Sequence, residues 1–105
     1  MIHIRVEPVG KGYYELLESI IIEGIRIPSG FKWNGASIPR FFWRVVGTPF
    51  QPKYMAPSMV HDFLCGDEQY SRKEADKLFY KLLLVNGVNK ILARTMYYGV
   101  RIGAR

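Results

Sequence analysis

The side chains best suited to chemistry in this sequence are one histidine and two aspartates. His61 and Asp62 are neighbours, and neighbouring side chains on a helix diverge by about 100°, so only one of them can face a given site. Asp76 lies on the next predicted helix and approaches the pair if the two helices pack face to face. An imidazole with two carboxylates can perform acid–base catalysis or contribute ligands to a divalent metal. His61, Asp62 and Asp76 are therefore the candidate catalytic residues.

A polar loop over residues 31–39 supplies candidate binding residues. Its Asn34-Gly35 dipeptide predicts a turn, because glycine adopts a positive φ cheaply and asparagine tolerates one. Asn34, Ser37 and the neighbouring Trp33 could close over His61-Asp62 and position a substrate. The alternative is structural, since the same groups can form a hydrogen-bond network that fastens the loop to a helix. We take this loop-to-helix polar contact as the first interpretation and a catalytic centre as the second.

Strong catalytic signatures are absent from the sequence. It has no HExxH, no paired CxxC, no GxSxG and no phosphate-binding GxxxxGK[ST] motif. Its one cysteine, Cys65, excludes an internal disulfide and is interpreted as a structural thiol before a nucleophile. A bound divalent metal stays an open alternative, with His61, Asp62 and Asp76 as its possible ligands.

The net charge of +6 is concentrated in the last third of the chain. Positive and negative side chains balance over residues 1–71, whereas residues 72–105 hold eight Lys and Arg against Glu74 and Asp76. A basic surface of this kind suits nucleic acid, an anionic lipid face or an acidic protein partner. An ordinary solvated helix surface is the alternative.

Basic and aromatic residues also share one face of the last predicted helix. They are Arg94, Tyr97, Tyr98 and Arg101, at helical spacing. Such a face occurs both on nucleic-acid surfaces and on protein interfaces, so these four are candidate binding residues for either partner.

Composition and hydrophobic pattern predict an α+β fold, in which a small N-terminal antiparallel sheet packs against three to four C-terminal helices. The 105 residues suit a single domain over 1–105. Strands are expected over 13–18 and 20–27, with a further strand over 2–6. Helices are expected over 41–46, 56–65, 72–85 and 89–102, the last two as an antiparallel hairpin. Ser71 and Glu74 form a capping-box signature for the third of these helices.

We expect neither a secretory leader nor a membrane-spanning helix. The first residues lack the basic and apolar regions of a signal peptide. No apolar run approaches the ~20 residues that a membrane span requires.

Several motifs together resemble DUF1353, a family of small phage and prophage proteins of unknown function. The chain shares a Pro-x-Gly-Phe segment and an Asp-Gly-Ala-Ser-Ile-Pro-like loop, followed by a helix with His-Asp and a helix with Ala-Asp. These motifs read Ile27–Phe31, Trp33–Arg40, His61–Leu64 and Ser71–Asp76, and the end Met96–Gly103 is also similar. One departure is Asn34, where the family pattern has Asp. This change removes a charge and favours a hydrogen-bonding role over that of a metal ligand or base.

The resemblance implies a phage or prophage setting, in the virion or the host cytoplasm. The first hypothesis is a structural or assembly protein, of the tail or head–tail region, that contacts other phage proteins or further copies of itself. The second is a small hydrolase of cell-wall or phosphoester bonds that uses His61, Asp62 and Asp76. A third is a nucleic-acid-binding accessory protein that uses residues 72–105.

Overall fold

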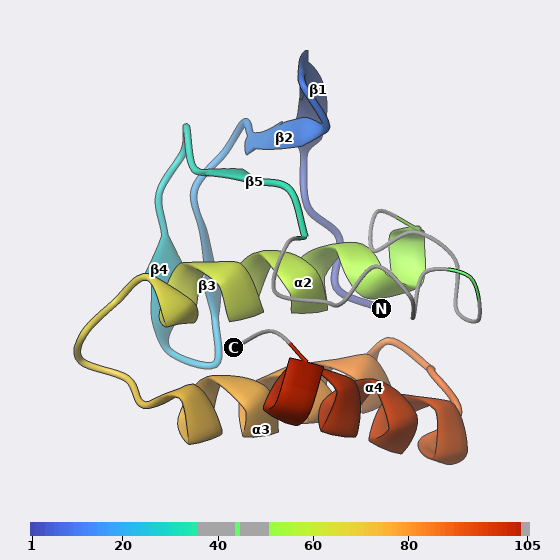
Figure 1. Ribbon diagram of the computed structural model, residues 1–105. Coiled ribbons are helices and arrows are strands. Elements are labelled where there is room, and N and C mark those ends of the chain that lie inside the picture. Colours follow the sequence, from blue (N-terminus) through green and yellow to red (C-terminus); the bar gives the residue numbers. More distant parts are fainter. Residues whose placement is uncertain (36–43, 45–50, 104–105) are drawn as a thin grey trace. The chain divides into compact units, whose positions relative to one another are not determined.

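The structure is a computed structural model that describes residues 1–35, 44 and 51–103 (Figure 1). The chain divides into two compact units, residues 3–34 and residues 1–2 with 35–105. Antiparallel strands come first and helices follow, which confirms the α+β class. Ser37 and the helix expected over 41–46 lie outside the described residues, apart from position 44.

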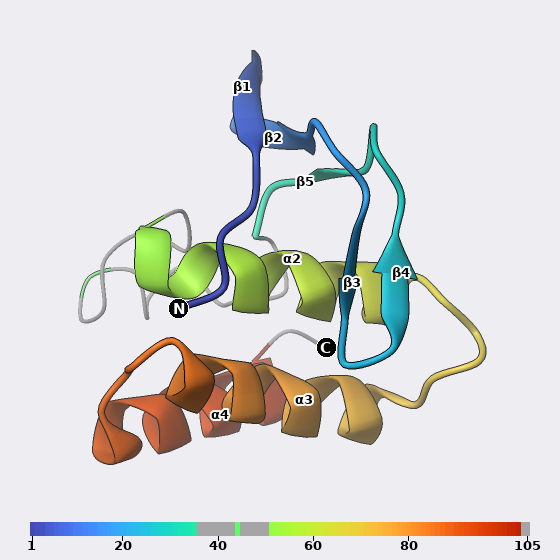
Figure 2. The same ribbon diagram turned by 180° about the vertical axis from the view of Figure 1, so that it is seen from behind.

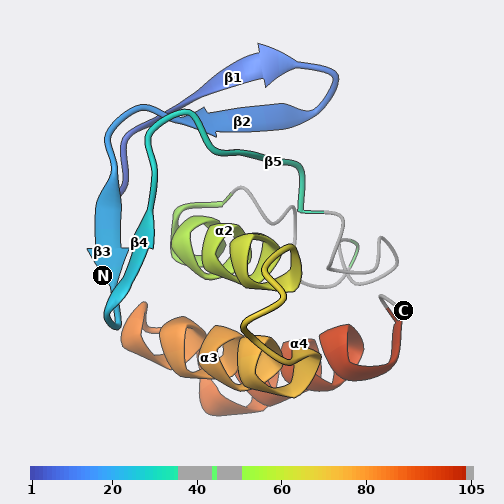
Figure 3. The same ribbon diagram turned by 90° about the vertical axis from the view of Figure 1, so that its left-hand side faces the viewer.

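The first unit contains a three-stranded antiparallel sheet in the order β1-β2-β5. Its strands are β1 (Val6–Gly10), β2 (Tyr13–Leu16) and β5 (Lys32–Trp33) (Figure 3). The strand expected over 2–6 was placed too early, because β1 begins at Val6 and continues to Gly10. Pro8 fits β1 because an edge strand leaves one row of amides unused.

The remaining strands of this unit form a separate hairpin, β3 (Ile20–Ile22) and β4 (Ile25–Ile27) (Figure 2). The prediction of one strand over 20–27 was therefore wrong. Glu23 and Gly24 have φ of 52° and 77°, and two successive positive φ values reverse the chain in a two-residue hairpin turn. Glutamate at the first turn position does not predict a hairpin turn, since asparagine, aspartate or glycine is the usual residue there.

The first helix of the second unit for which the structure gives bounds is α2 (Pro52–Cys65), which starts four residues before the position expected from the sequence. Pro52 occupies the first turn, where a missing amide costs nothing, while Pro57 lies inside the helix. Pro57 cannot donate to the carbonyl of Lys53, four residues earlier. Asn86 replaces that bond, because its Nδ2 donates to the Lys53 carbonyl at 3.0 Å while its Oδ1 accepts from the Ile2 amide at 2.8 Å.

Helices α3 (Arg72–Val85) and α4 (Lys90–Gly103) follow as the predicted hairpin. The capping box is present, with Ser71 Oγ accepting from the Glu74 amide and Glu74 accepting from the Ser71 amide, both at 3.0 Å. Helix α3 contacts both α2 and α4. A shared apolar core joins the three helices through Tyr54, Phe79, Leu83, Val88, Ala93, Met96 and Val100. No helix in the described part of the chain is long and apolar enough to cross a membrane.

Candidate functional site

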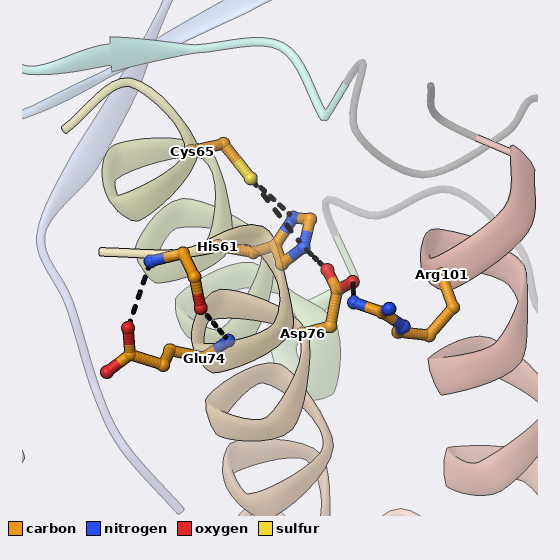
Figure 4. A network of polar contacts seen from close by, with 6 residues as sticks. His61, Cys65, Glu74, Asp76 and Arg101 are labelled. Carbon is orange, nitrogen blue, oxygen red and sulfur yellow. Dashed lines mark hydrogen bonds and ion pairs between the residues drawn. The ribbon is translucent and has the colours of Figure 1, made fainter. Parts of the chain in front are cut away.

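His61 and Asp76 meet inside the helical unit. His61 lies on the third turn of α2 and Asp76 on the second turn of α3, and both side chains are fully buried. The imidazole Nε2 and the Asp76 Oδ1 are 2.5 Å apart, a short charge-assisted hydrogen bond (Figure 4). The His61 ring also packs against Phe79, with ring centroids 5.2 Å apart. The packing of α2 on α3 therefore brings together two of the three candidate catalytic residues.

Arg101 completes this cluster from α4. Its guanidinium Nη1 donates to Asp76 Oδ2 at 3.0 Å, and its side chain is one-third exposed. One buried carboxylate thus links a cation on α2 to a cation on α4 (Figure 4). Sequence reasoning placed Arg101 on an outer face, because helical spacing alone does not show which neighbour a long side chain reaches.

Cys65 lies one turn after His61 on α2, but its geometry is not that of an activated nucleophile. Its Sγ is 3.8 Å from both ring nitrogens of His61. A sulfur equidistant from the two nitrogens does not point along the lone pair of either, whereas a general base must be aligned with the proton it takes. Cys65 therefore acts as a packing and polar contact of the ring.

His61 carries a proton at neutral pH. Burial by itself lowers the pKa of the His61 imidazole. The hydrogen bond to Asp76 and smaller contributions from Cys65 together outweigh the effect of burial, and they raise the pKa from 6.5 to about 9. The ring is therefore an imidazolium that donates to Asp76. In this state it has no lone pair with which to accept a proton from a substrate.

Asp62 makes a separate contact, with the backbone of Gly35. Its Oδ2 accepts from the Gly35 amide at 3.2 Å, and Gly35 has the positive φ of 73° expected of the Asn34-Gly35 turn. Asn34 itself is half-buried and belongs to the strand unit. Trp33 is also in that unit, 2% exposed and stacked on Phe31 with centroids 6.3 Å apart.

A divalent-metal site is not assembled by the described residues. In residues 1–35, 44 and 51–103, no group of three His, Cys, Asp or Glu side chains comes together at metal-binding distance. The buried cluster pairs its one carboxylate with two cations, a charge arrangement that repels a further cation.

The outer face of α4 differs from the one expected. Tyr98 is 56% exposed and Arg94 is exposed, but Tyr97 is half-buried and meets Tyr80 edge to face. Two side chains that sequence reasoning missed, Ile91 and Ile102, are 80% and 79% exposed. Their spacing to Tyr98 could have identified them as candidate binding residues, because positions 91, 98 and 102 lie on one helical face.

Comparison with known proteins identifies the family. Residues 14–100 match the profile described as "Protein of unknown function (DUF1353)". The uncharacterized proteins y4jT and y4iH of Sinorhizobium fredii are 35% and 33% identical to the chain over 70% and 66% of its length. The matched stretches make up 22% and 29% of those two proteins, so the chain spans less than a third of either. No solved structure matches it. The chain belongs to the DUF1353 family.

Proposed function

We propose that this protein is a structural or assembly component of a bacteriophage or prophage particle and works through protein–protein contacts. The observation that carries the proposal is the exposure of Ile91 and Ile102 on α4, at 80% and 79%. Isoleucine is among the residues most often buried, and large apolar side chains that share one exposed face are typical of protein interfaces. The phage setting comes from the family resemblance.

The state of the polar cluster supports contact over catalysis. A catalytic acid or base must reach its substrate, and both His61 and Asp76 are 0% exposed. A pKa of about 9 also keeps the imidazole protonated at neutral pH, where a general base must be neutral. The cluster instead connects α2, α3 and α4, and so fixes the helix that presents the exposed apolar residues.

The relatives support a modular role. The matched regions make up 22% and 29% of the two rhizobial proteins, so in those relatives the shared region is part of a longer chain. A region that contributes a contact surface can do so within a longer chain, because its interface does not depend on its neighbours in sequence.

The direct test is mass spectrometry of purified particles and assembly intermediates from the phage or prophage that encodes the chain. We expect the protein at a fixed copy number relative to the other particle proteins. Its repeated absence from both fractions would contradict the proposal.

A small hydrolase of cell-wall or phosphoester bonds is the competing function. The short His61–Asp76 hydrogen bond favours it, because it brings together two of the three candidate catalytic residues. The discriminating variant is His61→Gln, which removes the imidazole but keeps a hydrogen-bonding side chain. We expect infection and lysis by a phage with this variant to change only as far as protein stability changes. Loss of a hydrolytic activity of the purified protein, at undiminished stability, would favour the enzyme.

A further inference from the structure

We infer that the outer face of α4 binds an acidic protein segment with an apolar face of its own, and this inference rests on the proposed function. The binding face is defined here as Ile91, Arg94, Thr95, Tyr98 and Ile102, all of them exposed. A second copy of the chain, nucleic acid and lipid each match the apolar and basic side chains of this face less well than such a segment does.

The apolar part of the binding face forms a continuous stripe. Ile91, Tyr98 and Ile102 follow one another at spacings of seven and four, so they project from the same side of α4 over three turns. The buried residues Ala93, Met96 and Val100 occupy the opposite side, where they contact the core. The stripe is thus separate from the surface by which α4 is anchored.

The charged side chains that α4 itself places beside the stripe are all positive. Lys90 and Arg94 are exposed beside it, and the segment Lys90–Gly103 contains no Asp or Glu. A partner with acidic side chains flanking its apolar residues would match both properties of the face and would be steered to it at low salt.

The same charge argument excludes a second copy as the occupant. A symmetric dimer places the same patch of both subunits together, so each Arg94 would approach a basic surface. Helix α4 offers no carboxylate to pair with it, and the Asp76 carboxylate is buried and held by His61 and Arg101.

Nucleic acid and lipid fit the face less well. Phosphate groups are bound by Lys, Arg and hydrogen-bond donors, and two isoleucines at about four-fifths exposure contribute nothing to such contacts. A helix that lies in a membrane interface inserts a broad apolar face, whereas the wide apolar face of α4 is already packed in the core.

The experiment is photo-crosslinking in host cells during particle production, with Tyr98 replaced by p-benzoylphenylalanine in the full chain. We expect a crosslink to a particle protein, located by mass spectrometry in a segment rich in Asp and Glu with apolar residues at helical or strand spacing. A crosslink to a second copy, to DNA, to RNA or to lipid, or no crosslink at all, would overturn the inference.

Two variants and one control test the chemistry of the contact. Ile91→Ser with Ile102→Ser removes the stripe, and Arg94→Glu reverses the charge. We expect each to reduce the crosslink yield about 10-fold, the loss typical of a central interface residue. Ile21→Ser is the matched control, since Ile21 is 68% exposed on β3, and its yield should equal that of the unmodified chain. Undiminished yield with Arg94→Glu, or an equal loss with Ile21→Ser, would contradict the inference.

Failure of this inference is distinguishable from failure of the proposed function. If the chain is present in particles but crosslinks through a segment without acidic residues, only the partner chemistry is wrong. If the chain is absent from particles and assembly intermediates, the proposed function itself fails.

Discussion

Asp76 is a fully buried carboxylate that accepts from a cation on each of two other helices. Removing one member of such a group leaves the others buried and uncompensated, which costs several times more than an exposed ion pair contributes. Asp76→Asn should therefore lower the free energy of unfolding by about 3–5 kcal/mol, measured by urea denaturation. Arg5→Gln is the control, because the Arg5–Glu18 pair is exposed, and it should cost less than about 1 kcal/mol.

The pH dependence of stability follows from His61. Its folded-state pKa of about 9 lies above the unfolded value of 6.5, so the protonated form is favoured by folding. The contribution is fully present below pH 6.5 and is lost as the pH rises through 9, and it amounts to about 3 kcal/mol. Urea unfolding between pH 6 and pH 9.5 should show this fall.

The His61→Gln variant controls for any other group whose titration contributes to the same fall in stability. Glutamine has no proton to lose, so this variant should be less stable at pH 6 and lack most of the decline. A decline as steep as that of the unmodified chain would show that His61 does not hold a raised pKa.

At the scale of elements, the junction between α2 and the end of α3 depends on Asn86. Its side chain accepts from the Ile2 amide and donates to the Lys53 carbonyl that Pro57 cannot serve. Asn86→Ala should cost about 1–3 kcal/mol, because both partners lose a hydrogen bond. In a Pro57→Ala background the new amide can serve the Lys53 carbonyl, so the same change should cost about 1 kcal/mol less. Strict additivity in this double-mutant cycle would contradict the role assigned to Asn86.

Elements with local signals could be predicted from the sequence. The capping box at Ser71 and the break at Asn86-Gly87 set the bounds of α3, because both act within a few residues. The start of α2 could not be predicted, since Pro57 resembles a helix boundary and is tolerated only because Asn86 compensates from 29 positions away in the sequence. The β3–β4 turn was missed because Glu23 adopts a conformation usually taken by asparagine or glycine.

The polar cluster was predictable only in part. The approach of Asp76 to His61 followed from the assumption that consecutive helices pack face to face, and the structure has this packing. The complete burial of the His61–Asp76 pair and the contribution of Arg101 depend on the tertiary arrangement of three helices. Spacing along one helix does not encode that arrangement. The exposure of Ile91 and Ile102 was missed although their spacing places them on one helical face with Tyr98, because an isoleucine on a helix is expected to face the core.

At the scale of the whole molecule, the residues that stabilise the helices and those proposed to bind a partner are separate. The His61–Asp76–Arg101 cluster and the apolar core hold α4 in place from one side, and the stripe of Ile91, Tyr98 and Ile102 faces the other. Changes to the stripe should therefore leave stability unaltered, within about 0.5 kcal/mol, because exposed side chains away from the core contribute little to it.

The most direct test of the central claim is the copy number of the chain in purified particles, compared between the unmodified protein and the Ile91→Ser, Ile102→Ser double variant. We predict that the double variant keeps its unfolding free energy but is lost from the particles, while Ile21→Ser is incorporated normally. Equal incorporation of the double variant and the unmodified chain would contradict the claim that the protein works through contacts made by α4.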